Sequence, residues 1–289
     1  MSVVNRLLAV GGETTEASPL AESYDPSAKR WRWIAPMRGR RVAAAGAVLD
    51  GAVYVSGGRN AQEETERTCE VWDPVRDAWT SVKGMDQHRH EHALVAWDGH
   101  LYAIGGSHRG RLATVERYER REDRWDQVTP LPVAMSSVVG HVVDGHLWAI
   151  GATEYGAAQV VYQVWQLDAR AERWARLDQL TTRRRWPAVA AHGTSIYVIG
   201  GQAGDQITAE VQRFEVGGGE APPPPPIPTA RCAAATAVFD DRLYVIGGAL
   251  HDRTPTGAVE GLDLTGGGWH QAPSLGYPRA GLCAVVLPL

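Results

Sequence analysis

The chain has 289 residues, of which 44% are hydrophobic, and its formal net charge is -4 with an isoelectric point near 6.2. The apolar share is enough for a packed core, and the mild acidity gives no global reason to expect nucleic-acid or membrane binding. There is no apolar run long enough to span a bilayer and no signal-peptide pattern.

Pairs of adjacent glycines recur along the chain at nearly equal intervals. They stand at Gly11-Gly12, Gly57-Gly58, Gly105-Gly106, Gly200-Gly201 and Gly247-Gly248, with a degraded copy at Gly151-Ala152. The intervals are 46, 48, 46, 49 and 47 residues, so the chain reads as six copies of one unit. A period in this range is typical of radially repeated β folds.

Each repeat predicts four short strands, as the copy between residues 89 and 125 illustrates. Apolar residues 93–97 meet Asp98-Gly99, a two-residue hairpin turn whose central positions need positive φ, and residues 101–104 follow. A third strand includes Glu116-Arg117-Tyr118, and Trp125 opens a fourth. Four antiparallel strands in meander order make one propeller blade. The turn recurs at Asp50-Gly51, Asp144-Gly145, His192-Gly193 and Asp240-Asp241.

Tryptophans recur at one slot, six residues after an acidic residue: Trp31, Trp79, Trp125, Trp174 and Trp269. We expect them to fill the space between neighbouring blades. The fifth repeat has Ala221 at this slot, followed by Pro222 to Pro226. Because proline cannot donate to a strand ladder, this run fits an outermost edge strand, which it would protect. A polyproline ligand for a partner domain is the alternative.

The two ends of the chain are expected to complete one blade together. The first glycine-pair strand has no partner before it, and residues 281–287 read as an inner strand with nothing after it. Pairing them would remove two exposed edges. The prediction is therefore an all-β, six-bladed propeller of four-stranded antiparallel blades, one domain over residues 1–289, closed by the C-terminal strand. Since the repeats fill the chain from end to end, we expect a domain of a longer protein.

Three cysteines, Cys69, Cys232 and Cys283, are odd in number and lack a Cys-x-x-Cys spacing. This favours a reduced intracellular compartment, so a cytoplasmic location is expected, with the nucleus as a second possibility.

The repeat carries a recognisable motif order: glycine pair, Glu-x-Tyr-Asp-Pro, tryptophan, then Pro-Met and an arginine. It stands as Glu22-Ser23-Tyr24-Asp25-Pro26, as Glu70-Val71-Trp72-Asp73-Pro74, and as Pro36-Met37 through Arg41. The chain resembles the kelch-repeat propellers over its whole length, most of all the C-terminal propellers of BTB-kelch proteins. Repeat four departs most, with Gly151-Ala152 and with Met135 in place of arginine.

The resemblance implies a substrate receptor of a cullin-RING E3 ubiquitin ligase. In BTB-kelch proteins the propeller holds the substrate, while BTB and BACK domains recruit the ligase. Neither of those domains is expected within this chain, so the ligase connection would depend on other segments of the protein.

The loops before the inner strands and after the glycine pairs are expected to lie on one face, around a channel mouth. Arginines gather there on a chain that is acidic overall, and guanidinium groups bind carboxylates bidentately. We therefore predict binding of a short acidic or phosphorylated peptide. The resemblance implies docking at the same rim, where the repeated arginines and Arg59-Asn60 match contact positions. The predicted partner-binding residues are Arg41, Arg89, Arg184, Arg231, Arg279, Arg59, Asn60, His88, His90, Arg109, Ser136, Tyr155, Arg183, Arg185 and Trp186.

The five repeated arginines also permit an architectural interpretation, in which they bond loop carbonyls. If they contact the partner, replacing Arg41, Arg89 and Arg184 by alanine should abolish peptide binding while melting changes little. The non-repeating residues are better candidates for specificity, because the scaffold does not require them.

Chemistry is not expected from the remaining motifs. His88, His90 and His92 alternate on an extended strand and span roughly 13 Å, too far to converge on one metal ion. No nucleophile motif or phosphate loop is evident, so neither a cofactor, nor a metal, nor catalysis is predicted. Two alternatives stay open: a cytoskeletal scaffold that contacts filaments, and a small-molecule enzyme such as a sugar mutarotase.

Overall fold

Four-stranded antiparallel sheets make up the protein, described here by a computed structural model. The structure describes residues 5–14, 20–25, 28–155, 159–168 and 170–288. Within these ranges there are six four-stranded sheets, one two-stranded sheet and no helix. We call each four-stranded sheet a blade and number the blades by the order of their second strands along the chain. The chain divides into two compact units, Met1–Val42 with Val75–Ala78 and Arg184–Leu289, and Ala43–Pro74 with Trp79–Arg183.

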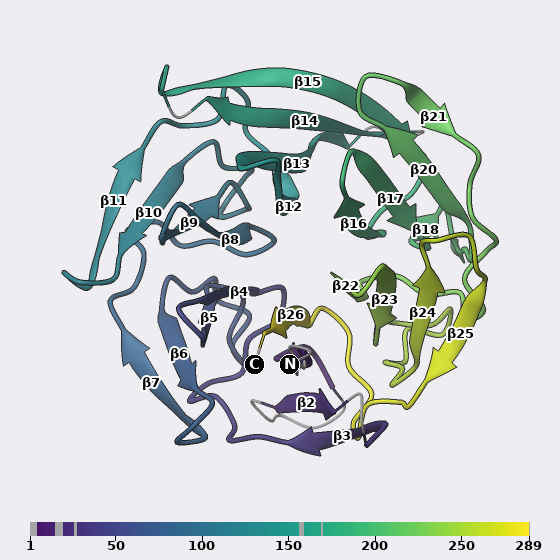
Figure 1. Cartoon of the computed structure of the whole chain (residues 1–289), viewed down its shortest axis with the longest axis horizontal. Coiled ribbons are helices and arrows are strands. Elements are labelled where there is room, and N and C mark those ends of the chain that lie inside the picture. The colour runs from purple at the N-terminus through teal and green to yellow at the C-terminus, as the bar shows by residue number, and fades with distance from the viewer. Residues whose placement is uncertain (1–4, 15–19, 26–27, 156–158, 169, 289) are drawn as a thin grey trace. The chain divides into compact units, whose positions relative to one another are not determined.

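The first unit contains blades one, five and six. Blade one has the order β26-β1-β2-β3, blade five β16-β17-β20-β21 and blade six β22-β23-β24-β25 (Figure 1). The strands are β1 (Arg6–Val10), β2 (Ala21–Asp25), β3 (Arg30–Trp33), β16 (Ala188–His192), β17 (Ser195–Ile199), β18 (Gln202–Ala203), β19 (Gln206–Ile207), β20 (Val211–Glu215), β21 (Gly219–Ala221), β22 (Ala235–Phe239), β23 (Arg242–Ile246), β24 (Val259–Asp263), β25 (Trp269–Ala272) and β26 (Cys283–Leu287). Strands β18 and β19 form the small hairpin.

The second unit contains blades two, three and four, each a meander of consecutive strands. Their strands are β4 (Ala45–Leu49), β5 (Ala52–Ser56), β6 (Cys69–Asp73), β7 (Ala78–Val82), β8 (Ala93–Trp97), β9 (His100–Ile104), β10 (Val115–Glu119), β11 (Arg124–Val128), β12 (Ser136–Val143), β13 (His146–Tyr155), β14 (Val160–Asp168) and β15 (Arg173–Thr182). Residue Ala78, the first of β7, falls in the first unit.

The C-terminal strand completes blade one, as predicted. β26 pairs antiparallel with β1 in the register Arg6↔Leu287 to Val10↔Cys283. The fold class, an all-β six-bladed propeller with this closure, is thereby confirmed. That residues 1–289 form a single domain stays a prediction.

The hairpin turns have the predicted backbone. Asp98 and Gly99 both have positive φ, 48° and 73°, which suits a two-residue turn between β8 and β9. Asp240 and Asp241 take the same conformation without glycine, at 51° and 53°. Aspartate tolerates this left-handed region better than most residues, so the sequence signal survives the loss of glycine.

The glycine pairs join neighbouring blades through the backbone. The Gly58 N–H donates to the carbonyl of Arg89 at 2.9 Å, from blade two to the segment that precedes blade three. A Cβ on Gly57, at φ 59°, would collide with the same carbonyl oxygen. Only glycine meets both requirements, the positive φ and the close approach.

Blade four lacks the second glycine and its strands run longer. Gly151-Ala152 lies inside β13, which continues to Tyr155 with ladder partners up to Val160. Gly151 is absent from the positive-φ residues of the described chain, so the strand does not turn there. Tyr155, predicted in a loop, is thus the last residue of a strand.

The tryptophan slot lies between blades, as predicted. Trp125 and Trp174 are buried, and their indole N–H groups donate to the carbonyls of Lys83 (2.8 Å) and Thr129 (3.0 Å) in the preceding blade. In the first unit, Trp269 donates to the Pro225 carbonyl at 2.8 Å. Burying such a side chain contributes about 1.5–3 kcal/mol each, and each indole also has its hydrogen bond.

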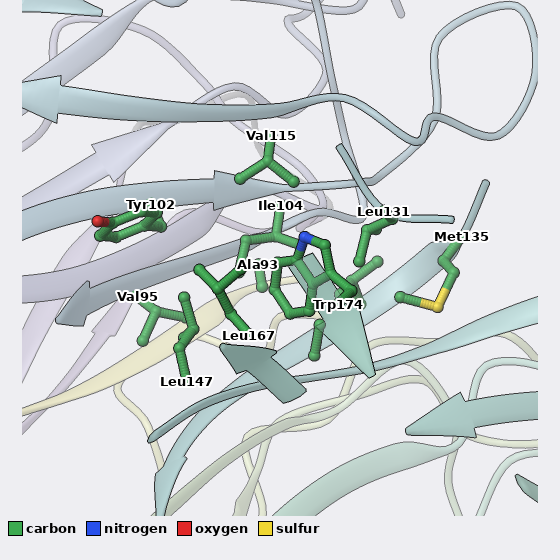
Figure 2. Packing of buried hydrophobic residues seen from close by; sticks show 12 residues of the cluster. Ala93, Val95, Tyr102, Ile104, Val115, Leu131, Met135, Leu147, Leu167 and Trp174 are labelled. Carbon is green, nitrogen blue, oxygen red and sulfur yellow. The ribbon is translucent and has the colours of Figure 1, made fainter. Parts of the chain in front are cut away.

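The cores lie between adjacent blades of the same unit. One cluster joins blades three and four through Tyr102, Ile104, Leu147, Leu167 and Trp174 (Figure 2). The indole of Trp174 lies at the centre of the labelled side chains in this view.

The proline run of repeat five directly follows the edge strand β21 and takes part in no strand. β21 has three residues, whereas the other outer strands of the first unit have four. The prolines therefore stand where the outer edge of blade five would otherwise continue.

Candidate functional site

The five repeated arginines are buried. Their exposed fractions are 4% for Arg41, 0% for Arg89, 2% for Arg184, 1% for Arg231 and 0% for Arg279. A guanidinium group with so little exposure has to find partners inside the protein. In this structure none of the five presents its charge to a ligand.

Arg89 shows what the arginines bind. Its Nη1 donates to the carbonyls of Gly105 (2.8 Å) and Thr114 (3.1 Å), and its Nη2 pairs with Glu116 Oε1 at 2.5 Å. Glu116 is itself fully buried and accepts from the backbone N–H of Asp86 (2.6 Å) and Gln87 (3.1 Å). Burial lowers the pKa of Arg89, and Glu116 opposes that shift. The arginine thus ties the start of blade three to its second and third strands.

The same arrangement recurs in the first unit. Arg279 pairs with Glu22 at 2.9 Å and donates to the Gly11 carbonyl at 3.1 Å. Arg231 pairs with Glu260 at 2.9 Å, although burial lowers its pKa to about 10. In these ion pairs both the arginine and the glutamate are buried, so a desolvation penalty opposes their Coulomb attraction. Hydrogen bonds from the guanidinium groups to backbone carbonyls add to that attraction.

Blade five replaces the glutamate by a glutamine. Arg184 Nη2 donates to Gln212 Oε1 at 2.5 Å, while Nη1 donates to the carbonyls of Gly200 (3.0 Å) and Glu210 (2.6 Å). A neutral acceptor therefore serves the same position. What the arginine requires is a hydrogen-bond acceptor at this point of the third strand, charged or neutral.

Blade four replaces both partners by apolar residues. Met135 stands at the arginine position and Trp165 at the glutamate position, opposite Ala149 in the ladder as Glu116 is opposite Ala103. Met135 is fully buried and Trp165 packs against the same core cluster. An apolar pair of suitable volume can replace a buried ion pair without loss of stability. The arginine is lost where its acceptor is lost, which is expected of an architectural contact.

The contacts therefore support the architectural alternative for the repeated arginines. They also reverse the expectation that replacing Arg41, Arg89 and Arg184 leaves melting unchanged. Removing the Arg89 side chain would leave the carboxylate of Glu116 buried without its charge partner. The signal for this was present in the sequence, because Glu22, Glu70, Glu116 and Glu260 stand at one repeat position.

Ser136 and Asn60, two further residues of the predicted set, also lie within the protein's own packing or hydrogen bonding. Ser136 is buried at the start of β12. Asn60 organises its own loop: its Oδ1 accepts from the backbone N–H of Gln62 (2.9 Å) and Glu64 (3.0 Å), and its Nδ2 donates to Glu66 (2.8 Å). Local bonds of this kind are typical of asparagine in turns.

The loops around the buried arginines are held together in pairs. After Arg89 and Arg184, the next residue exchanges two backbone hydrogen bonds with a residue that follows the glycine pair: His90 with Ser107 (3.1 and 2.8 Å), and Arg185 with Gln202 (2.8 Å twice). Cys232 and Ala249 do the same in blade six. The prediction that these two sets of loops lie side by side is confirmed within these blades.

A cluster of Arg59 and three histidines, His88, His90 and His108, lies on these loops in the second unit. Arg59 Nη2 donates to His90 Nε2 at 2.8 Å, which requires a neutral imidazole at that nitrogen. Burial first, then the charges of Arg59 and His108, lower the pKa of His90 to about 4. The rings of His88 and His108 stack with centroids 5.3 Å apart. Arg59 also lies 3.8 Å from Glu63.

The three alternating histidines face separate partners. His88 Nδ1 donates to the Thr65 carbonyl at 2.6 Å, His90 binds Arg59, and His92 Nε2 shares a hydrogen bond of 2.9 Å with Ser56. Among the described residues, no group of three or more histidine, cysteine or acidic side chains is arranged to hold a metal ion.

The exposed members of the predicted set are cationic or aromatic. Arg109, Arg183, Arg185 and Trp186 are all exposed, Trp186 by 46%. In the part of the chain that the structure describes, no carboxylate lies within ion-pair distance of Arg109 or Arg185. Their charges are thus available to a ligand. Sequence reasoning did not find one exposed aromatic pair, Trp33 and Tyr277, whose ring centroids are 5.8 Å apart.

None of the described residues forms a helix long and apolar enough to cross a membrane.

Comparison with known proteins gives a consistent result. Residues 45–248 match the family described as "KLHDC2/KLHL20/DRC7 Kelch-repeats domain". Kelch-like protein 36 of Rattus norvegicus is 29% identical over 301 residues, covering 98% of this chain and 49% of the relative. Kelch-like protein 35 of Mus musculus is 26% identical over 89% of this chain and 43% of its own length. Kelch-like protein 34 of Homo sapiens is 26% identical over 92% of this chain and 44% of its own length. The chain spans about half the length of the curated relatives it matches.

Proposed function

Because the chain belongs to the kelch-repeat family, we propose that it is a protein-recognition module that holds a short segment of a partner protein. The observation that carries the proposal is the position of the exposed, unpaired cations. Arg109 and Arg185 stand on loops that two-way backbone bonds and buried arginines fix in place. Loops ordered in advance lose little entropy when a ligand docks.

The segment that fits these loops is acidic or phosphorylated. Guanidinium groups bind carboxylate and phosphate oxygens bidentately, and each unit offers exposed guanidinium groups of its own: Arg109 and Arg183 in the second unit, and Arg185 in the first. The buried arginines Arg41, Arg89, Arg184, Arg231 and Arg279 support the loops instead of touching the ligand. Arg59 takes an intermediate place, since it is partly exposed but donates to the buried His90.

A role as substrate receptor of a cullin-RING ubiquitin ligase extends this proposal to the whole protein. The resemblance to BTB-kelch proteins supports it, and the ligase would be reached through segments outside this chain. A reduced intracellular compartment belongs to the same proposal, and the free cysteines Cys69, Cys232 and Cys283 are compatible with it. Catalysis and a cofactor are not part of it.

Selection of peptides tests the proposal directly. A phage-displayed library of random peptides is panned against the immobilised 289-residue chain, and the enriched sequences are measured by calorimetry. We expect enrichment of Asp and Glu, and a binding constant that falls as salt rises, because the contacts are ionic. The double variant Arg109→Ala with Arg185→Ala should bind at least about ten-fold more weakly. Enrichment of neutral or basic peptides, or no enrichment over an empty support, would contradict the proposal.

A scaffold role has one observation in its favour. Trp33, on the outer strand β3, is 50% exposed and packs edge-on against Tyr277, which gives a blade side an aromatic surface. Exposed aromatic pairs occur at protein interfaces. A filament contact at this surface predicts that Trp33→Ala abolishes co-sedimentation with actin filaments. Retention of co-sedimentation in this variant, or its absence in the unmodified chain, would remove the scaffold role.

A further inference from the structure

One backbone position has positive φ in every blade, two residues after the repeated arginine. The residues there are Ala43, Glu91, Ser137, Trp186, Ala233 and Gly281, with φ between 49° and 62°. The carbonyls of Ala43, Glu91, Trp186 and Ala233 accept hydrogen bonds from the following blade; for Trp186 the donor is the Ala233 N–H, at 2.9 Å. The fold therefore uses the backbone of this position, while the side chains differ: Ser137 donates to Glu91 at 3.2 Å, whereas Ala43, Ala233 and Gly281 offer no polar group.

Tryptophan is the least expected residue at this position. A bulky side chain at positive φ is strained, and Trp186 also precedes Pro187, which restricts its backbone further. The equivalent residues in blades six and one of the same unit are Ala233 and Gly281, so small residues suffice. The indole is 46% exposed, and no described residue takes its N–H. Strain of this kind, held by the surrounding structure, is typical of ligand-binding positions.

Exposed arginines stand on loops of the same unit as Trp186. Arg185 is exposed, its backbone is bonded in both directions to Gln202, and no carboxylate of the described chain pairs with its guanidinium. Arg253 is exposed on the loop that follows the glycine pair of blade six. One acidic residue stands on each of the loops that follow the glycine pairs of blades five and six. Asp205 is exposed, while Asp252 accepts from the Thr254 N–H and hydroxyl at 2.9 and 2.5 Å. An exposed indole thus directly follows, in the sequence, an exposed arginine whose backbone is fixed by hydrogen bonds.

We propose that Trp186 and Arg185 form the anchor subsite for the bound peptide. The indole receives an apolar side chain of the peptide, and Arg185 binds a carboxylate next to it in the peptide sequence. Aromatic and arginine side chains supply most of the binding energy at many interfaces, which is why this pair, and not the buried arginines, determines affinity. This inference rests on the proposed function and deepens it, since it names the ligand as a segment with adjacent apolar and acidic residues.

Peptides selected by panning against the full chain provide the probe, and calorimetry with Trp186→Ala provides the test. Alanine already stands at the equivalent position 233, so the backbone is tolerated. We expect the dissociation constant to rise at least about ten-fold, and to rise similarly in Arg185→Ala. Val75→Ala is the control, because Val75 is an apolar residue that is 92% exposed, on the turn between β6 and β7. It should leave the affinity unchanged.

Thermal melting separates anchoring from a structural role. Trp186→Gly should raise Tm by about 2 °C, because glycine relieves the strain at positive φ, while peptide binding is lost. A fall in Tm would make the indole structural and overturn the inference. Unchanged affinity in Trp186→Ala would overturn it as well, with the proposed function intact. If panning enriches no peptide over an empty support, the proposed function fails and this subsite fails with it.

Discussion

At the scale of single residues, the repeated arginine is defined by its acceptor. Arg89, Arg231 and Arg279 each pair with a buried glutamate, Arg184 binds Gln212, and Met135 stands where the acceptor position is taken by Trp165. The side chain therefore changes together with its partner in the third strand. A ligand contact would not require such a match inside the blade.

This pairing predicts a strong and selective effect on stability. Arg89→Ala should lower the free energy of unfolding by about 3–5 kcal/mol, because it leaves Glu116 buried and unpaired. Glu116→Gln should lower it far less, by about 1 kcal/mol, since blade five already uses Arg184 with Gln212. Urea denaturation of the two variants checks the order. Equal losses, or a harmless Arg89→Ala, would show that the ion pair does not hold the blade.

His90 predicts a pH dependence with a definite sign. Its pKa is lowered to about 4 by burial and by Arg59 and His108, whereas an unfolded histidine titrates near 6.5. Below pH 6.5 the unfolded chain binds a proton at His90, whereas the folded chain does not bind it until the pH nears 4. The contribution of His90 to the free energy of unfolding is therefore complete above pH 6.5 and is lost as the pH falls towards 4. The loss is up to about 3 kcal/mol.

Comparison of His90→Gln with the unmodified chain isolates this contribution. Glutamine keeps an acceptor for Arg59 but has no proton to gain, so the stability of the variant should fall less between pH 6.5 and 4. Parallel stability curves over this pH range would show that His90 is protonated in the folded protein and that the assigned hydrogen bond from Arg59 is wrong.

At the scale of the elements, the glycine pair is the feature that both ends a strand and joins two blades. Gly57 and Gly51 both have positive φ, at 59° and 73°, but they differ in space: a Cβ on Gly57 meets the Arg89 carbonyl, whereas nothing lies within 4 Å of one on Gly51. Gly57 is required by its backbone conformation and by packing, whereas Gly51 is required by its backbone conformation alone.

The two glycines therefore provide a matched pair of variants. Gly51→Ala should cost about 1 kcal/mol, the usual penalty for a side chain in the left-handed region. Gly57→Ala should cost about 3 kcal/mol or more, because the blade-to-blade hydrogen bond at Gly58 is displaced as well. Chemical denaturation of both variants measures the difference. If the two costs were the same, the close approach of Arg89 would carry no weight.

The strands and turns could largely be predicted from the sequence, and the exceptions have physical causes. The Asp-Gly turns, the tryptophan slot and the pairing of the C-terminal strand follow from local chemistry and from the repeat. The long strands of blade four could not be predicted in this way. The second glycine of the pair is replaced by Ala152, the turn is lost, and β13 continues to Tyr155. The repeat predicts the structure that the blades share, but it does not predict how one altered residue changes a single blade.

For the candidate site, the sequence located the loops but not the exposure of their side chains. Arg184 and Arg185 are neighbours of the same residue type, yet one is buried and the other exposed. The sequence repeat predicts which of the two is buried only when the acceptor residues of the third strands are aligned together with the arginines. The strain at Trp186 has no sequence signal of its own, because it depends on a φ angle of 49° that the neighbouring blade imposes.

At the scale of the whole molecule, closure of blade one joins residues from the two ends of the sequence. β26 supplies the inner strand next to β1, and Leu7, Leu8, Val285 and Leu287 are buried there. Without this strand, β1 would expose an unpaired edge. The first unit therefore depends on the five residues of β26.

Deletion of residues 283–289 should leave a chain that aggregates or unfolds at lower urea concentration. A chain that lacks only residues 288 and 289 is the control, since it retains β26. Size-exclusion chromatography and urea denaturation followed by tryptophan fluorescence give the readout. A shortened chain that stayed monodisperse, with the midpoint of the control, would show that β26 contributes little to the first unit.

The central claim is that buried arginines hold the loops while exposed, non-repeating residues bind the partner, and Arg184 and Arg185 test it most directly. One selected acidic peptide is titrated by calorimetry into Arg184→Ala and Arg185→Ala, and both variants are melted in parallel. We predict that Arg185→Ala weakens binding about ten-fold at an unchanged Tm, and that Arg184→Ala lowers Tm by several degrees. Weaker binding in Arg184→Ala at an unchanged Tm, with full affinity in Arg185→Ala, would contradict the claim.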